Sequence, residues 1–480
     1  MKLYKIFLYI VASVGLLVII AAVFPKDGLH IAGIDIRFPS VEQITVPKEE
    51  SELRILLVEQ HEEMQKDLLD LKDSSDYYRQ LLDSGDTRFF FPNGNSNFFA
   101  PLFAQCDLSQ TTGRIIRILH YGDSQIEMDR MSSRIRAYMQ RTFGGGGPGM
   151  VPYSPIIRSL ALGQSASGAL TQYSPYGDSG IRRSNGNYGP LVNCHHLAGN
   201  ASASFSASGS RFADSLTQHF SSVRLLFDNN GGGTISATLS GRHLAVINKV
   251  CTGAGINSID WNLDTVVSAI KISVAGSGEL YGVMLDEGAG VAVDNIPLRG
   301  CSGQQFTQIA KYVLENAYAQ MDVGLIILQF GGNSVPYLKS EKSICTYASS
   351  IGRQIDRLHE VCPTAQILFI GPSDMSTSRG GSYQTYPMLP TVVETLRDTV
   401  VEHNAAFWSL FDAMGGEGSM TAWVSRGLAG PDYIHYTQRG SEIMGDCLAK
   451  SLENAYRYYQ LQTRINAKEK EKNTLAAQLE

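Results

Sequence analysis

The chain has 480 residues, of which 43% are hydrophobic and 18% are charged, so it can bury sizeable cores and a wholly disordered chain is excluded. At about 150 residues per domain, this length allows roughly three domains. The formal net charge of −6 provides no basic field, which argues against nucleic acid as the main partner. Seven cysteines, an odd number without a CxxC spacing, exclude a disulfide scaffold and give no local support to a cysteine zinc site.

The N-terminal residues 1–25 are predicted to form a signal anchor, that is, a single transmembrane helix. Lys2 and Lys5 precede the uncharged, largely apolar stretch 6–24, whose helical length nearly matches the hydrocarbon core of a bilayer. These lysines favour an N-terminus inside and the rest of the chain outside. The alternative is a cleaved signal peptide, but the apolar run is long and a clean A-x-A site is lacking. Both interpretations place the main body outside the cytoplasm.

Residues 26–112 are predicted to form stalk and linker helices. In the segment 48–88, 18 of 41 residues are charged, and leucines recur at steps of three and four. This pattern is typical of an amphipathic helix or short coiled coil that lifts the body from the membrane. A solvated helix packed on its own domain is nearly as consistent with the pattern. At the other end of the chain, residues 457–480 are predicted to be a charged helical tail without chemistry.

The body, residues 113–154 together with 282–456, alternates strand and helix patterns. Buried strands are expected at 114–120, 323–330 and 366–370, and helices at 126–141, 306–320, 344–361 and 389–403. This alternation predicts an α/β fold with a parallel sheet covered on both faces. On the first of these helices, 126–141, the polar face is expected to consist of Glu127, Asp129 and Arg130. Asp374, after the strand at 366–370, is expected to cap a loop.

Residues 155–281 interrupt this pattern. Ser, Ala, Gly and Asn dominate the segment, charged residues are few, and short alternating runs are separated by glycine turns. The pattern predicts an antiparallel β-sandwich inserted into the α/β domain, because α/β units occur on both sides of it. Small polar residues suit a hydroxyl-rich ligand, although they suit an inert sandwich equally.

Three separated blocks of polar residues carry candidate chemistry. Ser124 lies after a strand and before a helix, where its side chain is exposed at the carboxyl edge of the sheet. A serine needs a base, and Asp432 and His435 have the i,i+3 spacing that places a carboxylate beside an imidazole. Asn333 follows two glycines at another strand end. Each block alone is a weak signal, but chance is a poor explanation for all three together.

These three blocks, together with a fourth at residues 300–303, resemble those of the SGNH (GDSL-type) hydrolases. Gly122-Asp123-Ser124 matches the first block, Gly300-Cys301-Ser302-Gly303 the second, Gly331-Gly332-Asn333 the third, and Asp432 with His435 the fifth. The resemblance implies a three-layer, flavodoxin-like parallel sheet. It also implies a catalytic triad of Ser124, His435 and Asp432. The implied oxyanion hole consists of the Ser124 and Gly303 N–H groups, with Gly300 as the fallback, and the Asn333 amide.

Two departures from the family pattern are evident, because Gln125 replaces the usual leucine and Ser334 an aspartate. The start HYGDSQ looks like the branch that contains extracytoplasmic peptidoglycan O-acetylesterases and sugar O-acetyltransferases. Some members of that branch carry a carbohydrate-binding-like β-sandwich between the first two blocks, at the place of the insertion here.

The resemblance therefore implies a serine esterase that removes O-acetyl groups from an envelope glycan such as peptidoglycan, with no metal or organic cofactor. It would be anchored in a bacterial inner membrane with its catalytic domain in the periplasm, or secreted if the N-terminal segment is cleaved. A sugar O-acetyltransferase with the same site and a non-catalytic glycan-binding envelope protein are the alternatives.

Overall fold

The structure is a computed structural model that describes residues 3–479 except 27, 32–33, 42, 44–47, 211–212 and 230–231. The chain divides into two compact units. One comprises Met1–Asp76 with Gln460–Glu480, and the other Tyr77–Tyr459. The second unit contains the central sheet and every candidate site residue.

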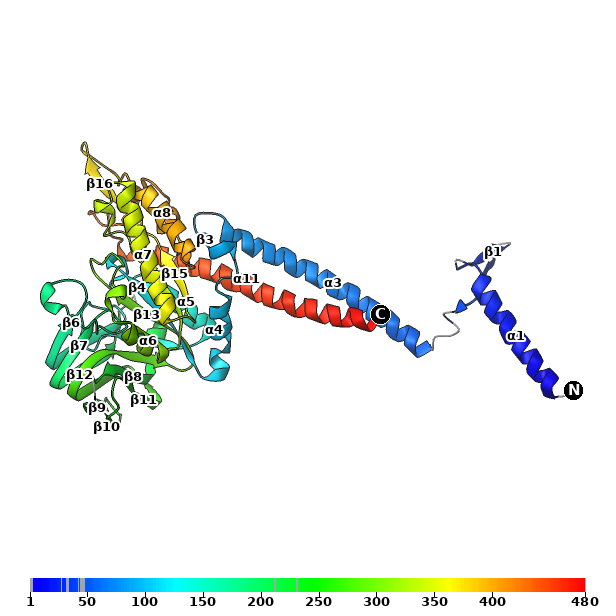
Figure 1. Ribbon diagram of the computed structural model, residues 1–480, viewed down its shortest axis with the longest axis horizontal. Helices are drawn as coiled ribbons and strands as arrows, with labels where there is room; N and C mark the ends of the chain where they lie inside the picture. Colours follow the sequence, from blue (N-terminus) through cyan, green and yellow to red (C-terminus); the bar gives the residue numbers. More distant parts are fainter. Residues whose placement is uncertain are drawn as a thin grey trace. The chain divides into compact units, whose positions relative to one another are not determined.

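A six-stranded sheet forms the centre of the larger unit (Figure 1). Its strands lie in the order β13-β4-β14-β15-β18-β3, and all neighbours are parallel except the short edge strand β3. In chain order the five parallel strands are arranged 2-1-3-4-5, which is the flavodoxin-like order expected from the sequence. The strands are β3 (Phe89–Phe90), β4 (Ile115–Gly122), β13 (Gly290–Pro297), β14 (Val323–Gln329), β15 (Gln366–Ile370) and β18 (Ala406–Trp408).

Helices cover both faces of this sheet and bury a separate hydrophobic cluster on each. Successive strand residues alternate between the clusters, so that Ile118 faces one and Leu119 the other. One cluster includes α6 (Lys311–Ala319), α7 (Glu341–Val361) and α8 (Leu389–Glu402). The other includes α4 (Ala100–Thr112), α5 (Ser132–Phe143) and the first half of α11 (Gln438–Leu479). The three-layer α/β fold is thereby confirmed.

The helix after Ser124 begins later than expected. A short 3-10 turn, η2 (Ser124–Ile126), is followed by a loop, and α5 starts only at Ser132. Met128 and Asp129 have φ values of +60° and +66°, in the left-handed region that a right-handed helix does not contain. The prediction that Glu127, Asp129 and Arg130 form the polar face of a helix is therefore wrong.

Eight antiparallel strands form a second sheet, which is the expected β-rich insertion. The 19-residue strand β12 pairs with β7 and β9 along its first half and with β8 and β5 along its second. The strands are β5 (Gly146–Val151), β6 (Leu162–Tyr173), β7 (Cys194–Ala207), β8 (Phe220–Asp228), β9 (Ile235–Ser240), β10 (Ile247–Cys251), β11 (Ile256–Val267) and β12 (Ala269–Glu287).

The insertion has its own core, although its limits differ from the expected 155–281. Residues from both halves, including Phe205, Leu225 and Trp261, share one buried cluster. Because β12 continues through both halves, a single hydrogen-bonded sheet replaces the two separate sheets of a sandwich. The sheet also takes in residues 146–151 and 282–287, which the sequence pattern had assigned to the α/β domain.

Smaller elements follow β15, close to the carboxyl edge of the central sheet. They are the hairpin of β16 (Ser376–Arg379) and β17 (Ser382–Thr385), and the helices α9 (Leu410–Met414) and α10 (Ser419–Ser425).

Among its described residues, the smaller unit contains helical segments and a short hairpin. α1 (Leu3–Val23) is the one described helix long and apolar enough to cross a membrane, a property that an N-terminal signal sequence shares. β1 (Leu29–Ile31) and β2 (Ile34–Ile36) pair after it. α3 (Lys48–Asp83) packs against the end of α11 through Leu68, Leu71 and Ile465. The C-terminal part of α11 is thus one helix of a packed pair rather than a separate charged tail.

Candidate active site

Ser124 lies directly beyond the carboxyl end of β4, on a turn that Asp123 holds. The carboxylate Oδ1 of Asp123 accepts a hydrogen bond of 2.9 Å from the Gln125 N–H and so caps η2. Glycine at 122 leaves room for close packing, because a Cβ there would lie 3.0 Å from the Ile126 side chain. The turn therefore presents the half-buried Ser124 hydroxyl at the sheet edge.

Ser124, His435 and Asp432 form a continuous hydrogen-bonded chain. Ser124 Oγ lies 2.7 Å from His435 Nε2, and His435 Nδ1 lies 2.7 Å from Asp432 Oδ2. In a neutral imidazole, an Nδ1–H donated to Asp432 leaves Nε2 free to accept the Ser124 proton. The structure thus brings together the three residues expected from the sequence.

Asp432 is held as an anion despite its partial burial. Partial burial acts to raise its pKa, but hydrogen bonds from the His435 ring and from two backbone N–H groups outweigh burial and lower it. These N–H groups belong to Ile434 and His435 and donate to Oδ1 at 3.0 and 3.1 Å. One carboxylate oxygen therefore orders the loop while the other orients the ring.

A pocket of about 200 Å³ opens beside Ser124 and His435. Asn333, which follows β14, lies in its wall, and strands β4 and β14 are neighbours at the point where the strand order reverses. The Asn333 Nδ2 donates to the Cys301 carbonyl at 3.0 Å and to Asp123 Oδ2 at 3.4 Å. The amide thus joins the first and second motif blocks beside the nucleophile.

Gly303 is placed differently from Asn333. Its φ of +84° and the Phe330 ring, 2.9 Å from where a Cβ would lie, both favour glycine. Among the described residues, those that line the pocket include Phe330 and Asn333 but not Gly303. The alternative Gly300 also has a positive φ, but a Cβ there would meet open space. The structure therefore gives a steric reason for glycine at 303 that is absent at 300.

The pocket also contains Tyr337, which the sequence patterns did not single out, and Asp123 of the first block. Tyr337, on the short turn η6 (Val335–Tyr337), is 79% exposed and lines the pocket. Burial raises the pKa of Asp123 to about 6, although the Gln125 N–H and His435 oppose the shift. In the sequence, the only local signal for Tyr337 is that it is an aromatic residue directly after a proline, soon after the third block.

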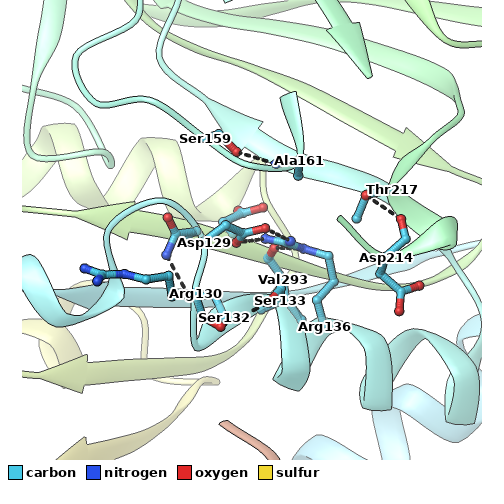
Figure 2. A network of polar contacts seen from close by, with 12 residues as sticks. Asp129, Arg130, Ser132, Ser133, Arg136, Ser159, Ala161, Asp214, Thr217 and Val293 are labelled. Carbon is cyan, nitrogen blue, oxygen red and sulfur yellow. Dashed lines mark hydrogen bonds and ion pairs between the residues drawn. The ribbon is translucent and has the colours of Figure 1, made fainter. Parts of the chain in front are cut away.

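The loop between η2 and α5 is fixed by a buried ion pair. Figure 2 shows Asp129 and Arg136 pointing toward each other, with two hydrogen bonds of 2.5 and 2.9 Å between them. Arg136 also donates to the Val293 carbonyl on β13 at 2.7 Å. These tertiary contacts hold the left-handed turn at Asp129.

Asp374 caps a loop, as expected from the sequence. Its carboxylate accepts hydrogen bonds of 2.8 Å from the Met420 N–H and from Thr385 Oγ1. Asp374 therefore supports the wall of the pocket behind Ser373, which lines it.

No family model and no curated protein matches the chain. A solved structure of a peptidoglycan O-acetylesterase matches 77% of this chain and 99% of its own, with 21% identity and a TM-score of 0.59. A carbohydrate esterase of family 2 with a carbohydrate-binding domain, from Corynascus thermopiles (Myceliophthora fergusii), matches 57% of this chain and 98% of its own, with 13% identity and a TM-score of 0.27. A GDSL-like lipase from Parabacteroides merdae covers 34% of this chain and 74% of its own, with 15% identity and a TM-score of 0.27. The first similarity confirms the SGNH-type fold.

Proposed function

We propose that the protein is a membrane-anchored, extracytoplasmic SGNH-type carboxylic ester hydrolase that removes O-acetyl groups from an envelope glycan such as peptidoglycan. The observation that carries the proposal is the hydrogen-bonded chain from Ser124 through His435 to Asp432 beside an open pocket. A binding protein has no need for a serine whose hydroxyl is aligned on a base.

The chemistry is acyl transfer through a covalent acyl-enzyme. As the Ser124 Oγ attacks the ester carbonyl, His435 Nε2 takes its proton, and Asp432 stabilises the resulting imidazolium. The N–H groups of Ser124 and Gly303 and the Asn333 amide stabilise the oxyanion. His435 returns the proton to the sugar oxygen as the C–O bond breaks. Water then attacks the acyl-enzyme as His435 takes its proton, and His435 returns that proton to Ser124 Oγ as acetic acid leaves and ionises to acetate.

Three further features support a glycan as the substrate. The fold is shared with a peptidoglycan O-acetylesterase. Tyr337 offers an exposed aromatic face at the pocket, and such faces suit the apolar face of a sugar ring. The apolar helix α1 would hold the enzyme beside the cell envelope, with its body outside the cytoplasm.

The direct test is mass spectrometry of O-acetylated peptidoglycan incubated with the purified protein. We expect loss of acetyl groups from the glycan and release of free acetate. Transfer of the acetyl group to an added sugar acceptor, without free acetate, would favour the O-acetyltransferase alternative. Unchanged glycan with every acceptor would favour a non-catalytic glycan-binding protein.

A further inference from the structure

The side chain of Gln125 contacts the backbone on both sides of His435. Its Nε2 donates to the Ile434 carbonyl at 2.7 Å, and its Oε1 accepts from the Tyr436 N–H at 3.3 Å. Gln125 is itself buried and directly follows Ser124. One amide thus joins the segment that carries the serine to the segment that carries the imidazole.

The loop that carries His435 is ordered mainly by hydrogen bonds, among them one of 2.7 Å from the Gly430 N–H to the His435 carbonyl. The side chains of His435 and Asp432 are 40% and 48% exposed, so packing around them is limited. The neighbouring Tyr433 has a φ of +57°, outside the region that most residues prefer. Hydrogen bonds must therefore supply much of the order in this loop.

Other contacts hold the loop from different directions. On the side of the β16–β17 hairpin, the Ser376 N–H donates to the Tyr433 carbonyl at 3.0 Å, and the Tyr383 ring stacks on that of Tyr433 at 3.6 Å. On the side of the nucleophile, Arg130 donates to the Ser124 carbonyl at 2.7 Å and to the Tyr436 carbonyl at 3.1 Å. Gln125 alone, among the described contacts, bonds the backbone on both sides of His435.

We propose that Gln125 is a positioning residue that keeps His435 Nε2 within hydrogen-bonding distance of Ser124 Oγ. The inference rests on the proposed function, since positioning of a base has meaning only in a catalytic site. A leucine, the usual residue at this place in SGNH hydrolases, can fill the space but can bond neither Ile434 nor Tyr436. This chain therefore depends on an amide where the family pattern has a hydrocarbon.

The test is the kinetics of full-length Gln125→Leu and Gln125→Met on a small acetyl ester, the second variant preserving the length of the side chain. We expect kcat to fall about 10- to 100-fold with KM within about twofold, because misplacement of a base slows chemistry without weakening binding. The rate at which a fluorophosphonate probe labels Ser124 should fall by the same factor. A smaller folded fraction would also lower the apparent kcat at unchanged KM, so kcat is expressed per Ser124 that the probe labels at completion.

A matched control is Gln110→Leu on α4. Gln110 Nε2 also donates to two backbone carbonyls, those of Phe143 and Ala289, but at the opposite end of the central sheet. We expect Gln110→Leu to change melting temperature and leave kcat unaltered. The positioning role is contradicted if folded Gln125→Leu or Gln125→Met retains kcat within about threefold of an active wild type. A wild-type protein that neither cleaves the ester nor reacts with the probe would instead contradict the proposed function, and the positioning role with it.

Discussion

At the scale of single residues, Asn333 has two competing roles. Its amide bonds the Cys301 carbonyl, which is a structural task, and it also lines the pocket beside Ser124. Loss of one such hydrogen bond costs about 1 kcal/mol of stability. Loss of an oxyanion donor costs about 10²–10³ in kcat.

We therefore expect Asn333→Ala to lower kcat by about 10²–10³ while the free energy of unfolding falls by only about 1 kcal/mol. The variant Asn316→Ala on the exposed side of α6, whose amide bonds the Tyr312 carbonyl, serves as the control. Steady-state kinetics and denaturant unfolding of both variants measure the two effects. A kcat within threefold of wild type in Asn333→Ala would leave only the structural role.

The raised pKa of Asp123 predicts that the stability of the protein depends on pH. Its pKa rises from the ordinary 3.8 to about 6 because burial penalises the charged form. The folded state thus favours the protonated carboxyl, and this advantage is fully present below about pH 4 and is lost as pH rises through 6. A shift of this size corresponds to about 3 kcal/mol.

We expect Asp123→Asn, which cannot ionise, to gain stability relative to wild type as pH rises from 4 to 6, with a constant difference above that range. Denaturant unfolding of both proteins at several pH values measures the difference. A difference that does not change with pH would contradict the shifted pKa.

At the scale of elements, the sequence predicts those that have a continuous apolar pattern. It does not predict those that tertiary contacts define. The strand Gln366–Ile370 and the helix α7 have the expected type and place, because their residues alternate or repeat against a core. Strand β5 was missed because four of its six residues are glycine or proline, so it lacks periodicity. Gly147, with a φ of +87° and the Leu285 carbonyl oxygen 2.2 Å from a Cβ position, shows that backbone approach defines this strand.

The loop before α5 gives a prediction at the same scale. Asp129 and Arg136 are both buried and paired, so Asp129→Asn removes the ion-pair partner of a buried charge. We expect a loss of about 3–5 kcal/mol in the free energy of unfolding. The exposed pair Arg134–Asp446 is the control, and Asp446→Asn should cost at most about 1 kcal/mol. Equal effects in denaturant unfolding would contradict a fixing role for the buried pair.

At the scale of the whole molecule, the strand order explains why distant motifs meet. Ser124 and Asn333 follow adjacent parallel strands, and His435 reaches them from the loop before α11. The family resemblance therefore predicted that Ser124, His435, Asp432 and Asn333 lie close together. It could not predict the contacts of Gln125 or Arg130, because these depend on backbone atoms 300 or more residues away in the chain.

The proposed binding of a glycan polymer also belongs at the scale of the whole molecule. Deletion of residues 155–281 would remove most of β12 and leave β5 paired only with the remaining end of that strand, so a point variant is the better probe. We expect Tyr337→Ala to lower kcat/KM on peptidoglycan about five- to tenfold, about 1 kcal/mol, and to leave a small acetyl ester within twofold. Tyr337→Phe should retain activity on both substrates, and Tyr312→Ala, an exposed tyrosine of α6, is the control. Equal losses on the two substrates would contradict a role in polymer binding.

The central claim is that Ser124 is a nucleophile activated by His435. The most direct measurement is peptide mapping of the full-length protein after reaction with a fluorophosphonate probe, combined with acetate release from peptidoglycan. We expect the label on Ser124 in the wild type, no label on that peptide in Ser124→Ala, and a rate of acetate release about 10⁴–10⁶ lower in this folded variant. A label on another residue, or more than a tenth of wild-type activity in Ser124→Ala, would contradict the claim.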